Sequence, residues 1–215
     1  MNITDNERDA VYKTIFSRRD VRSEFKPDPI PQDVLERILT AAHHAPSVGF
    51  MQPWDFILVQ SDGTKSAIKK GFEKAHAESA EMFDENKKQQ YKRLKLEGIT
   101  ESPLGICVTC DRSRNGPVVL GRTIKPEMDL YSVVCAIQNL WLAARAENLG
   151  VGWVSIVHDS VFRDTLGIPD NIDIVAYLCV GYVSHFNEKP ELEKIGWLPR
   201  QNLESVIHYD KWSSK

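Results

Sequence analysis

The sequence predicts a three-layer α/β domain, in which helices cover both faces of a central sheet. Three observations lead to this prediction. Short apolar runs of strand length alternate with longer segments of helical periodicity. No linker rich in Pro, Gly or Ser divides the chain, so we expect one domain over residues 1–215. The composition, with 42% hydrophobic and 27% charged residues, is that of a globular protein and excludes a disordered or fibrous one.

The expected helices are the segments in which apolar residues recur with a period of about 3.6 residues. They cover residues 5–17, 31–43, 127–149 and 160–166. The helix at 127–149 is apolar nearly all round, so it must be enclosed, either within the fold or against a second subunit. The expected strands are 54–60, 104–110, 151–157 and 173–181, and the tail at 205–208 would add an edge strand. A turn is expected at 61–63, and Gly150 is expected to terminate the long helix.

The segment 73–97 differs from the rest of the chain because twelve of its 25 residues are charged. Such a segment can bury only a narrow stripe. Its apolar members include Met82, Phe83 and Tyr91. Two interpretations remain open: a solvated helical hairpin without a function, or a lid that lies over a ligand.

Charge and hydropathy exclude several function classes. The chain has 30 acidic and 27 basic residues, so it offers no overall positive field for nucleic acid or an anionic membrane. No apolar run approaches the roughly 18 residues of a membrane span. The first ten residues lack the features of a secretory signal. We therefore expect a cytoplasmic protein that binds neither nucleic acid nor membranes.

The four cysteines are expected to be reduced thiols of the core. Cys107 and Cys110 have the C-x-x-C spacing of metal and redox sites, but residues three apart on a strand point to opposite faces. No second pair of ligands completes a tetrahedral site, so no metal is expected. The sequence also lacks a P-loop, a G-x-S-x-G nucleophile motif and a dinucleotide fingerprint.

A cluster of arginines follows the first predicted helix. Arg18, Arg19 and Arg22 lie within five residues, and converging guanidinium groups would hold a phosphomonoester. The alternative is a surface cluster that Asp20 and Glu24 neutralise. A distant cation would favour the anion site.

Two further places offer polar groups to a ligand. In the loop at 45–54, Ser47 and Gln52 supply hydrogen-bonding groups, although an ordinary helix-to-strand connection has the same form. Ser155 places a hydroxyl among apolar strand residues, where it must bond either to the backbone or to a ligand. Arg200 is the distant cation that could join the arginine cluster, or a solvated side chain.

Together these motifs resemble the FMN-dependent nitroreductase superfamily. The resemblance is carried by Arg-Arg-Asp-Val-Arg at 18–22, Ser-Val-Gly-Phe-Met-Gln-Pro-Trp at 47–54, Pro-Glu-Met-Asp-Leu-Tyr at 126–131, Ala-Ile-Gln-Asn-Leu-Trp-Leu-Ala-Ala-Arg-Ala-Glu at 136–147 and Gly-Val-Gly-Trp-Val-Ser at 150–155. It covers nearly the whole chain. It implies an α+β fold with three layers (α/β/α), a central mixed sheet, and a homodimer with FMN at the subunit interface.

Departures from the common pattern of the superfamily point to a branch that consumes its flavin. Asp20 stands where members tend to have Ser or Thr, Phe50 where Asn is frequent, and Ser155 where Gly is common. The resemblance to this branch implies that reduced FMN is a substrate. The resemblance also implies that molecular oxygen fragments this flavin to 5,6-dimethylbenzimidazole, the lower ligand of vitamin B12, and erythrose 4-phosphate. A separate flavin reductase would supply the reduced FMN.

The resemblance also assigns roles to residues. Asp20 and Ser155 are the expected catalytic residues, and 73–97 is the expected lid. The expected flavin contacts are Arg18, Arg19, Asp20, Val21, Arg22, Ser47, Met51, Gln52, Leu104, Ser155 and Arg200. Asn202 departs from the pattern, which has a Pro soon after the C-terminal Arg, and this weakens the assignment of Arg200. The alternatives are an NAD(P)H-dependent nitroreductase or related FMN oxidoreductase and a non-catalytic FMN-binding protein.

Overall fold

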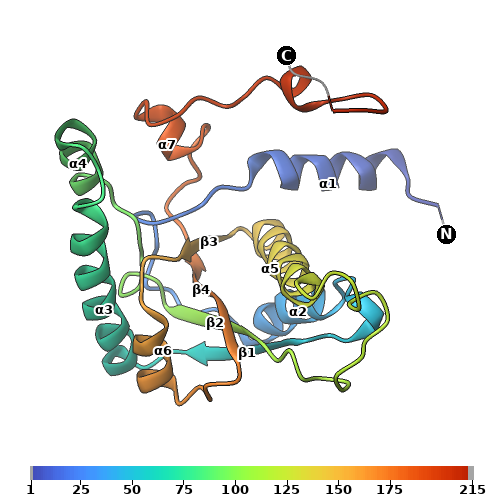
Figure 1. Ribbon diagram of the computed structural model, residues 1–215. Helices are drawn as coiled ribbons and strands as arrows, with labels where there is room; N and C mark the ends of the chain where they lie inside the picture. Colours follow the sequence, from blue (N-terminus) through green and yellow to red (C-terminus); the bar gives the residue numbers. More distant parts are fainter. Residues whose placement is uncertain (1, 213–215) are drawn as a thin grey trace.

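The computed structural model describes residues 2–212, and a four-stranded sheet forms its centre (Figure 1). The strands are β1 (Trp54–Val59), β2 (Leu104–Cys110), β3 (Leu149–Val154) and β4 (Asp173–Tyr182). They lie in the order β1-β2-β4-β3, and every neighbouring pair is antiparallel. The parallel pairing expected of a mixed sheet is limited to the isolated bridge between Asp20 and Val151.

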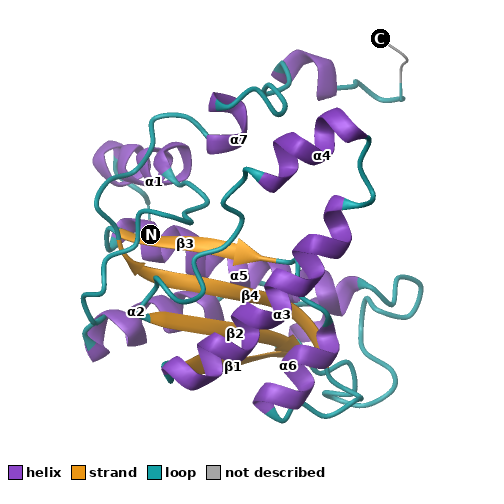
Figure 2. Ribbon diagram, turned by 90° about the vertical axis from the view of Figure 1, so that its left-hand side faces the viewer, coloured by secondary structure: helices purple, strands orange, loops and turns teal. Residues whose placement is uncertain are grey.

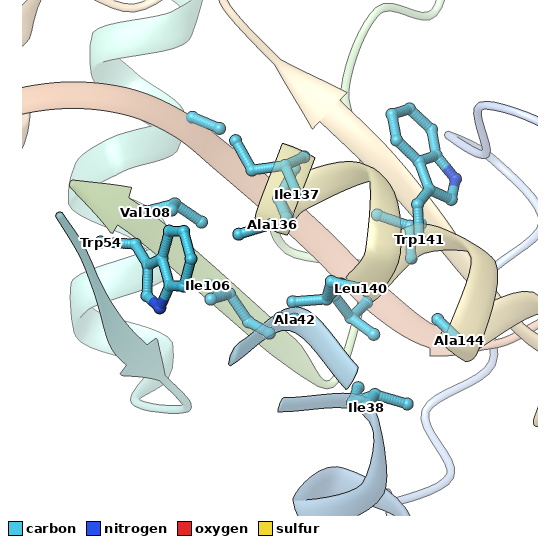
Figure 3. Packing of buried hydrophobic residues seen from close by; sticks show 14 of the residues in the cluster. Ile38, Ala42, Trp54, Ile106, Val108, Ala136, Ile137, Leu140, Trp141 and Ala144 are labelled. Atoms are coloured by element: carbon cyan, nitrogen blue, oxygen red, sulfur yellow. The ribbon is translucent and has the colours of Figure 1, made fainter. Parts of the chain in front are cut away.

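Helices α2 (Gln32–His43) and α5 (Met128–Ala146) cover one face of the sheet. Their apolar stripes meet over β2 in one buried cluster, to which Ile38, Ile106, Ile137 and Leu140 belong (Figure 3). All four side chains are at most 1% exposed. This packing is the main apolar contribution to the fold, because burying each such side chain stabilises it by roughly 1.5–3 kcal/mol.

Helices α3 (Asp62–Ala80) and α6 (Asp159–Leu166) cover the other face, and α4 (Glu85–Lys92) extends from α3 (Figure 2). Cys107 and Cys110 lie in the clusters on opposite faces, as strand alternation predicts. Burial raises the pKa of Cys107, Cys110 and Cys179 to about 12. Cys135 is exposed on α5, which corrects the prediction that all four thiols are buried.

The two ends of the chain run along the outside of this core. Helix α1 (Asp5–Ser17) has no buried residue, although one of its sides is apolar. Figure 1 shows it lying over α5, with the C-terminal segment beyond it. That segment contains α7 (Glu191–Lys194) and the 3-10 turn η2 (Leu203–Val206). The predicted edge strand at 205–208 is therefore wrong for the single chain.

Two other local predictions are corrected by the structure. The turn expected at 61–63 is the start of α3, because the Ser61 hydroxyl accepts the Thr64 N–H and caps the helix. Asn148, with a φ of 59°, takes the left-handed conformation after α5, which Asn tolerates better than most residues. Gly150 consequently lies inside β3.

None of the helices in residues 2–212 combines the length and hydropathy that a membrane crossing requires. Over the same residues, no three His, Cys, Asp or Glu side chains gather in a way that would hold a metal ion.

Candidate functional site

A cleft of about 720 Å³ lies between the end of α1, helix α5 and the C-terminal segment. It brings together polar residues that are far apart in the sequence. They are Arg18, Arg19, Asp20, Gln138, Glu188, Lys189, Glu193 and Arg200. Arg18 and Arg19 of the arginine cluster thus share a cleft with Arg200. Of the two possibilities for Arg200, a solvated side chain or a member of the arginine site, this arrangement is the second.

The arginines of the cluster have different surroundings. Arg19 donates from Nη1 to the carbonyls of Phe16 and Arg18 at 2.8 and 2.6 Å, and from Nη2 to the carbonyl of Glu188. Its guanidinium therefore ties the end of α1 to the C-terminal segment. Arg22 donates to Asp20. Neither arginine is free to give its full set of donors to a ligand.

Arg18 differs because the indole of Trp141 supports it. The guanidinium carbon lies 4.7 Å from the centroid of that ring, a cation–π arrangement. The indole N–H in turn donates to the carbonyl of Arg19 at 3.2 Å, which fixes the ring. Within residues 2–212, the guanidinium groups of Arg18 and Arg200 have no hydrogen-bonding or ion-pair partner, and both residues line the cleft. They are its two uncommitted guanidinium groups.

Asp20 is fixed by both of its carboxyl oxygens. Oδ1 accepts the backbone N–H of Trp153 at 3.0 Å, and Oδ2 accepts from Arg22 Nη2 at 2.5 Å. The backbone beside it pairs with β3, since the Val21 N–H donates to the Val151 carbonyl at 3.0 Å. Gly152 permits this approach, because a Cβ there would lie 2.0 Å from the Val21 oxygen. The Gly-Val-Gly motif thus positions Asp20.

The environment of Asp20 favours its protonated form. Burial raises the pKa of Asp20, although Arg22, the Trp153 N–H and Arg18 each favour the carboxylate. A carboxyl group with a raised pKa can exchange a proton at a pH where an exposed Asp stays ionised. This property belongs to proton-transfer groups and to some structural ion pairs alike.

The loop at 47–52 is held in an unusual conformation. Gly49, Phe50 and Gln52 have φ values of 53°, 54° and 49°, and Phe50 is a bulky residue for which this region is unfavourable. The Ser47 hydroxyl accepts the Gln52 N–H, and the Val48 N–H donates to the Ser132 hydroxyl of α5, both at 3.0 Å. Backbone strain that is fixed in this way is typical of functional loops.

This loop and the arginine cluster contact α5 at different places. The loop contacts Ser132, whereas Arg18 and Arg19 contact Trp141. Nine residues of helix separate these positions, which is roughly 13 Å along its axis. A single chain therefore does not bring Ser47 and Gln52 to the cleft.

The remaining predicted contacts lie elsewhere. Val21, Met51 and Leu104 have buried side chains, and Leu104 belongs to the core cluster beneath α5. Ser155 is exposed, one residue beyond the end of β3. The expectation of a buried Ser155 is therefore wrong for the single chain. It lies two residues from Trp153, whose N–H binds Asp20, or about 7 Å along an extended chain.

The segment 73–97 contains the end of α3, helix α4 and the coil that follows. Tyr91 is buried against His76, with ring centroids 4.7 Å apart. The Phe83 ring packs edge-on against Trp197 at 5.9 Å, and Lys87 Nζ lies 4.1 Å from the centroid of the same indole. Helix α4 therefore docks on the C-terminal segment, beside α7 (Figure 2), while Met82 is exposed.

Sequence reasoning missed Lys189, Gln138 and Trp141 as residues of this site. Lys189 follows β4 in an exposed loop, and no local pattern marks it. Trp141 belongs to the buried cluster that α5 forms with the sheet. Its contact with Arg18 depends on tertiary structure alone.

Comparisons with known proteins agree with this fold. A family model described as the nitroreductase family matches residues 15–182, so the chain belongs to the nitroreductase family. Its relatives include proteins named 5,6-dimethylbenzimidazole synthase. The Rhodospirillum rubrum protein is 41% identical over 90% of this chain and 92% of its own length. The Rhodobacter capsulatus protein is 37% identical over 94% of this chain and 97% of its own.

A solved structure shows the same fold at lower identity. It is the oxidised iodotyrosine deiodinase bound to FMN and 3-iodo-L-tyrosine, with a TM-score of 0.74 and 23% identity, over 94% of this chain and all of that one. This likeness confirms the α+β architecture that the motifs implied.

Proposed function

We propose that this chain is a 5,6-dimethylbenzimidazole synthase, which fragments reduced FMN with molecular oxygen to 5,6-dimethylbenzimidazole and erythrose 4-phosphate. The benzimidazole is the lower ligand of vitamin B12. Support comes from the nearly full-length relatives of that name. The observation that carries the proposal is the placement of a carboxyl group with a raised pKa, Asp20, in the same cleft as two uncommitted guanidinium groups.

The residues of the cleft fit FMN. A phosphomonoester requires cations that protein acceptors have not already saturated, and Arg18 and Arg200 meet this condition. Lys189 adds a third cation to the same wall. Ile15 and Phe16 supply apolar surface beside them. Gln138 lines the cleft from the middle of α5, and its uncharged amide can donate and accept hydrogen bonds.

When bound, reduced FMN supplies both the electrons that oxygen accepts and the ring that becomes the benzimidazole. Arg18 and Arg200 would hold the phosphate and so fix the position of the ring. Asp20 would accept a proton from the ribityl carbon that passes into the product. Ser155, two residues beyond the N–H that holds Asp20, would give a hydrogen bond near the flavin N5. The C-terminal segment, which lines the cleft, and helix α4, which docks on that segment, would exclude water from the ring.

A second copy of the chain completes the site in this proposal. The loop at 47–52 is about 13 Å from the arginine cluster along α5, so its polar groups reach the flavin from the partner subunit. The exposed apolar residues of α1 and α5 support the same arrangement. A separate flavin reductase delivers reduced FMN, since the reaction needs no second reduction within this site.

A single spectroscopic experiment tests the proposed function. Protein is mixed without oxygen with one equivalent of reduced FMN, air is admitted, and the absorbance near 450 nm is followed. We expect permanent loss of the oxidised-flavin band and 5,6-dimethylbenzimidazole in the chromatogram. Full return of the yellow band without product would instead identify an NAD(P)H-dependent nitroreductase, if NAD(P)H then bleaches it, or a non-catalytic flavin-binding protein, if it does not.

A further inference from the structure

The first residue of α7 approaches the Asp20–Arg22 pair from a distant part of the chain. Glu191 Oε2 lies 3.7 Å from Arg22 Nη1, while Arg22 Nη2 donates to Asp20. One guanidinium therefore lies between two carboxylates. The Arg22 side chain is only 12% exposed, and those of Asp20 and Glu191 are about one-third exposed. The three groups form one partly desolvated chain of charges at the wall of the cleft.

We propose that Glu191 is a positioning residue for Asp20, and that it acts through Arg22 to keep Asp20 able to accept a proton. This inference rests on the proposed function only in giving Asp20 the proton-transfer role. The geometry of the three groups does not depend on that role.

Glu191 has two effects on its neighbours. It holds the second nitrogen of Arg22, whose Nε is buried and has no acceptor within residues 2–212. It also leaves the three-residue chain with a net charge of −1 when Asp20 is ionised. A like charge opposes ionisation, so Glu191 keeps Asp20 more basic than a simple Asp–Arg ion pair would be. A more basic carboxylate is the better proton acceptor.

Other charges face these groups from the neighbouring elements. Arg18 favours ionisation of Asp20. Burial raises the pKa of Glu191, Arg22 opposes that rise, and Glu24 and Asp20 add to it. Lys194 of α7 opposes that rise. The remaining charged residues of the cleft are Arg19, Glu188, Lys189, Glu193 and Arg200. Of the carboxylates other than Asp20, only Glu191 forms an ion pair with Arg22 among the described residues.

The contact between Glu191 and Arg22 also links α7 to Asp20. Lys189, Pro190 and Glu193 flank Glu191 and line the same cleft as Asp20. A ligand that moves this segment therefore changes the distance from Glu191 to Arg22. A slight approach would convert the ion pair at 3.7 Å into a hydrogen bond.

The test measures Asp20 directly in protein without flavin. The side-chain carboxyl carbon of Asp20 is followed by NMR during a pH titration and assigned with Asp20→Asn. We expect Glu191→Gln to lower the pKa of Asp20. Glu193→Gln removes an equal charge two residues along α7 and should lower it less. Glu191→Asp keeps the charge, so the pKa of Asp20 in this variant should lie between the values in Glu191→Gln and in the wild type.

The same variants have a kinetic readout. In Glu191→Gln, the acid limb of the rate profile should move to lower pH, and the maximal rate should fall at least about threefold with little change in FMN affinity. An unchanged Asp20 titration in Glu191→Gln, or an equal shift in Glu193→Gln, would overturn the inference. The titration uses flavin-free protein, so its outcome is independent of the proposed function. The Asp20 titration can be unchanged in Glu191→Gln while the wild-type protein consumes FMN, and it can shift although the wild-type protein does not consume FMN. Thermal unfolding confirms that each variant is folded.

Discussion

Asp20 combines rigidity with an unfavourable charge, and this combination suits a residue that must move a proton. A backbone N–H and a guanidinium hold its two oxygens, while burial raises its pKa. The pKa of Asp20 is raised in spite of its pairing with Arg22, so a conservative replacement of Asp20 distinguishes a proton-transfer role from a structural one.

Asp20→Asn should abolish product formation while FMN still binds. The amide keeps the size of the side chain and its contact with the Trp153 N–H, but it cannot accept a proton from carbon. We expect the rate to fall by at least about 100-fold, measured as benzimidazole by chromatography, with the dissociation constant of FMN changed less than about threefold. Asp28→Asn, an exposed carboxyl eight residues further on, serves as the control. Wild-type product yield from Asp20→Asn would contradict the role.

The rate should also depend on pH in a direction that the environment of Asp20 sets. Protonated Asp20 cannot accept a proton, so the rate falls as the pH decreases through its pKa. Because burial raises that pKa, the fall should occur above the pH at which an exposed Asp titrates, about 3.9. Rates measured over a pH series at saturating reduced FMN check this. A rate that stays constant down to pH 4 would contradict it.

The different surroundings of Arg18 and Arg19 lead to opposite expectations for two adjacent residues. Arg18→Met keeps apolar contact with Trp141 but loses the charge, and should weaken FMN binding about 30-fold or more.

Arg19→Met removes three hydrogen bonds to main-chain carbonyls and should lower the unfolding temperature by about 3–8 °C. Fluorescence titration and calorimetry separate the two. Equal loss of affinity without loss of stability in Arg19→Met would contradict the division.

At the scale of elements, most of the fold could be predicted from the sequence. Periodicity predicts the four strands and the helices α2, α5 and α6 around the core, because burial of one face imposes that periodicity, and it also predicts α1 outside the core. It does not predict the first half of α3, which packs Ile68 and Phe72 against the sheet. The prediction for the tail at 205–208 is wrong because Ser-Val-Ile-His has only two apolar residues, and so short a segment has no period that distinguishes a strand from a turn. Arg200 could be named as a candidate, but Lys189 could not, since nothing local brings residue 189 to residue 18. The Glu191–Arg22 contact is tertiary for the same reason.

Helix α4 and the C-terminal segment support each other through one aromatic contact, and the lid proposal depends on it. Trp197→Ala removes the surface against which Phe83 and Lys87 pack. We expect α4 to separate from the segment that carries Arg200, so that water reaches the flavin. Product per FMN should fall at least about threefold, and hydrogen peroxide should rise correspondingly. The control is Leu198→Ala, at an exposed neighbouring residue. An unchanged ratio of product to peroxide in Trp197→Ala would contradict the lid.

At the scale of the whole molecule, apolar side chains are exposed on two neighbouring helices. Val11 and Phe16 of α1 are 53% and 72% exposed, and Tyr131 and Val134 of α5 are 54% and 43% exposed. A long helix that is apolar nearly all round, with one side uncovered, indicates a protein surface that another protein covers. The strained loop at 47–52 lies at the same end of α5 as Tyr131 and Val134, through its bond to Ser132. A second copy seated on this face would cover the apolar residues and deliver the loop at once.

Val134→Glu should therefore disrupt the proposed dimer and flavin binding together. A carboxylate at the centre of an apolar interface loses its hydration without gaining a partner, which costs several kcal/mol. We expect a molar mass near 24.4 kDa by light scattering, against twice that for the wild type, and FMN affinity reduced at least about tenfold. Met82→Glu adds the same charge at a residue that is 83% exposed on the α3–α4 connection, and should leave the molar mass unchanged. A monomeric Val134→Glu protein that still binds FMN with wild-type affinity would show that one chain holds the complete site, and the loop at 47–52 would then have another purpose.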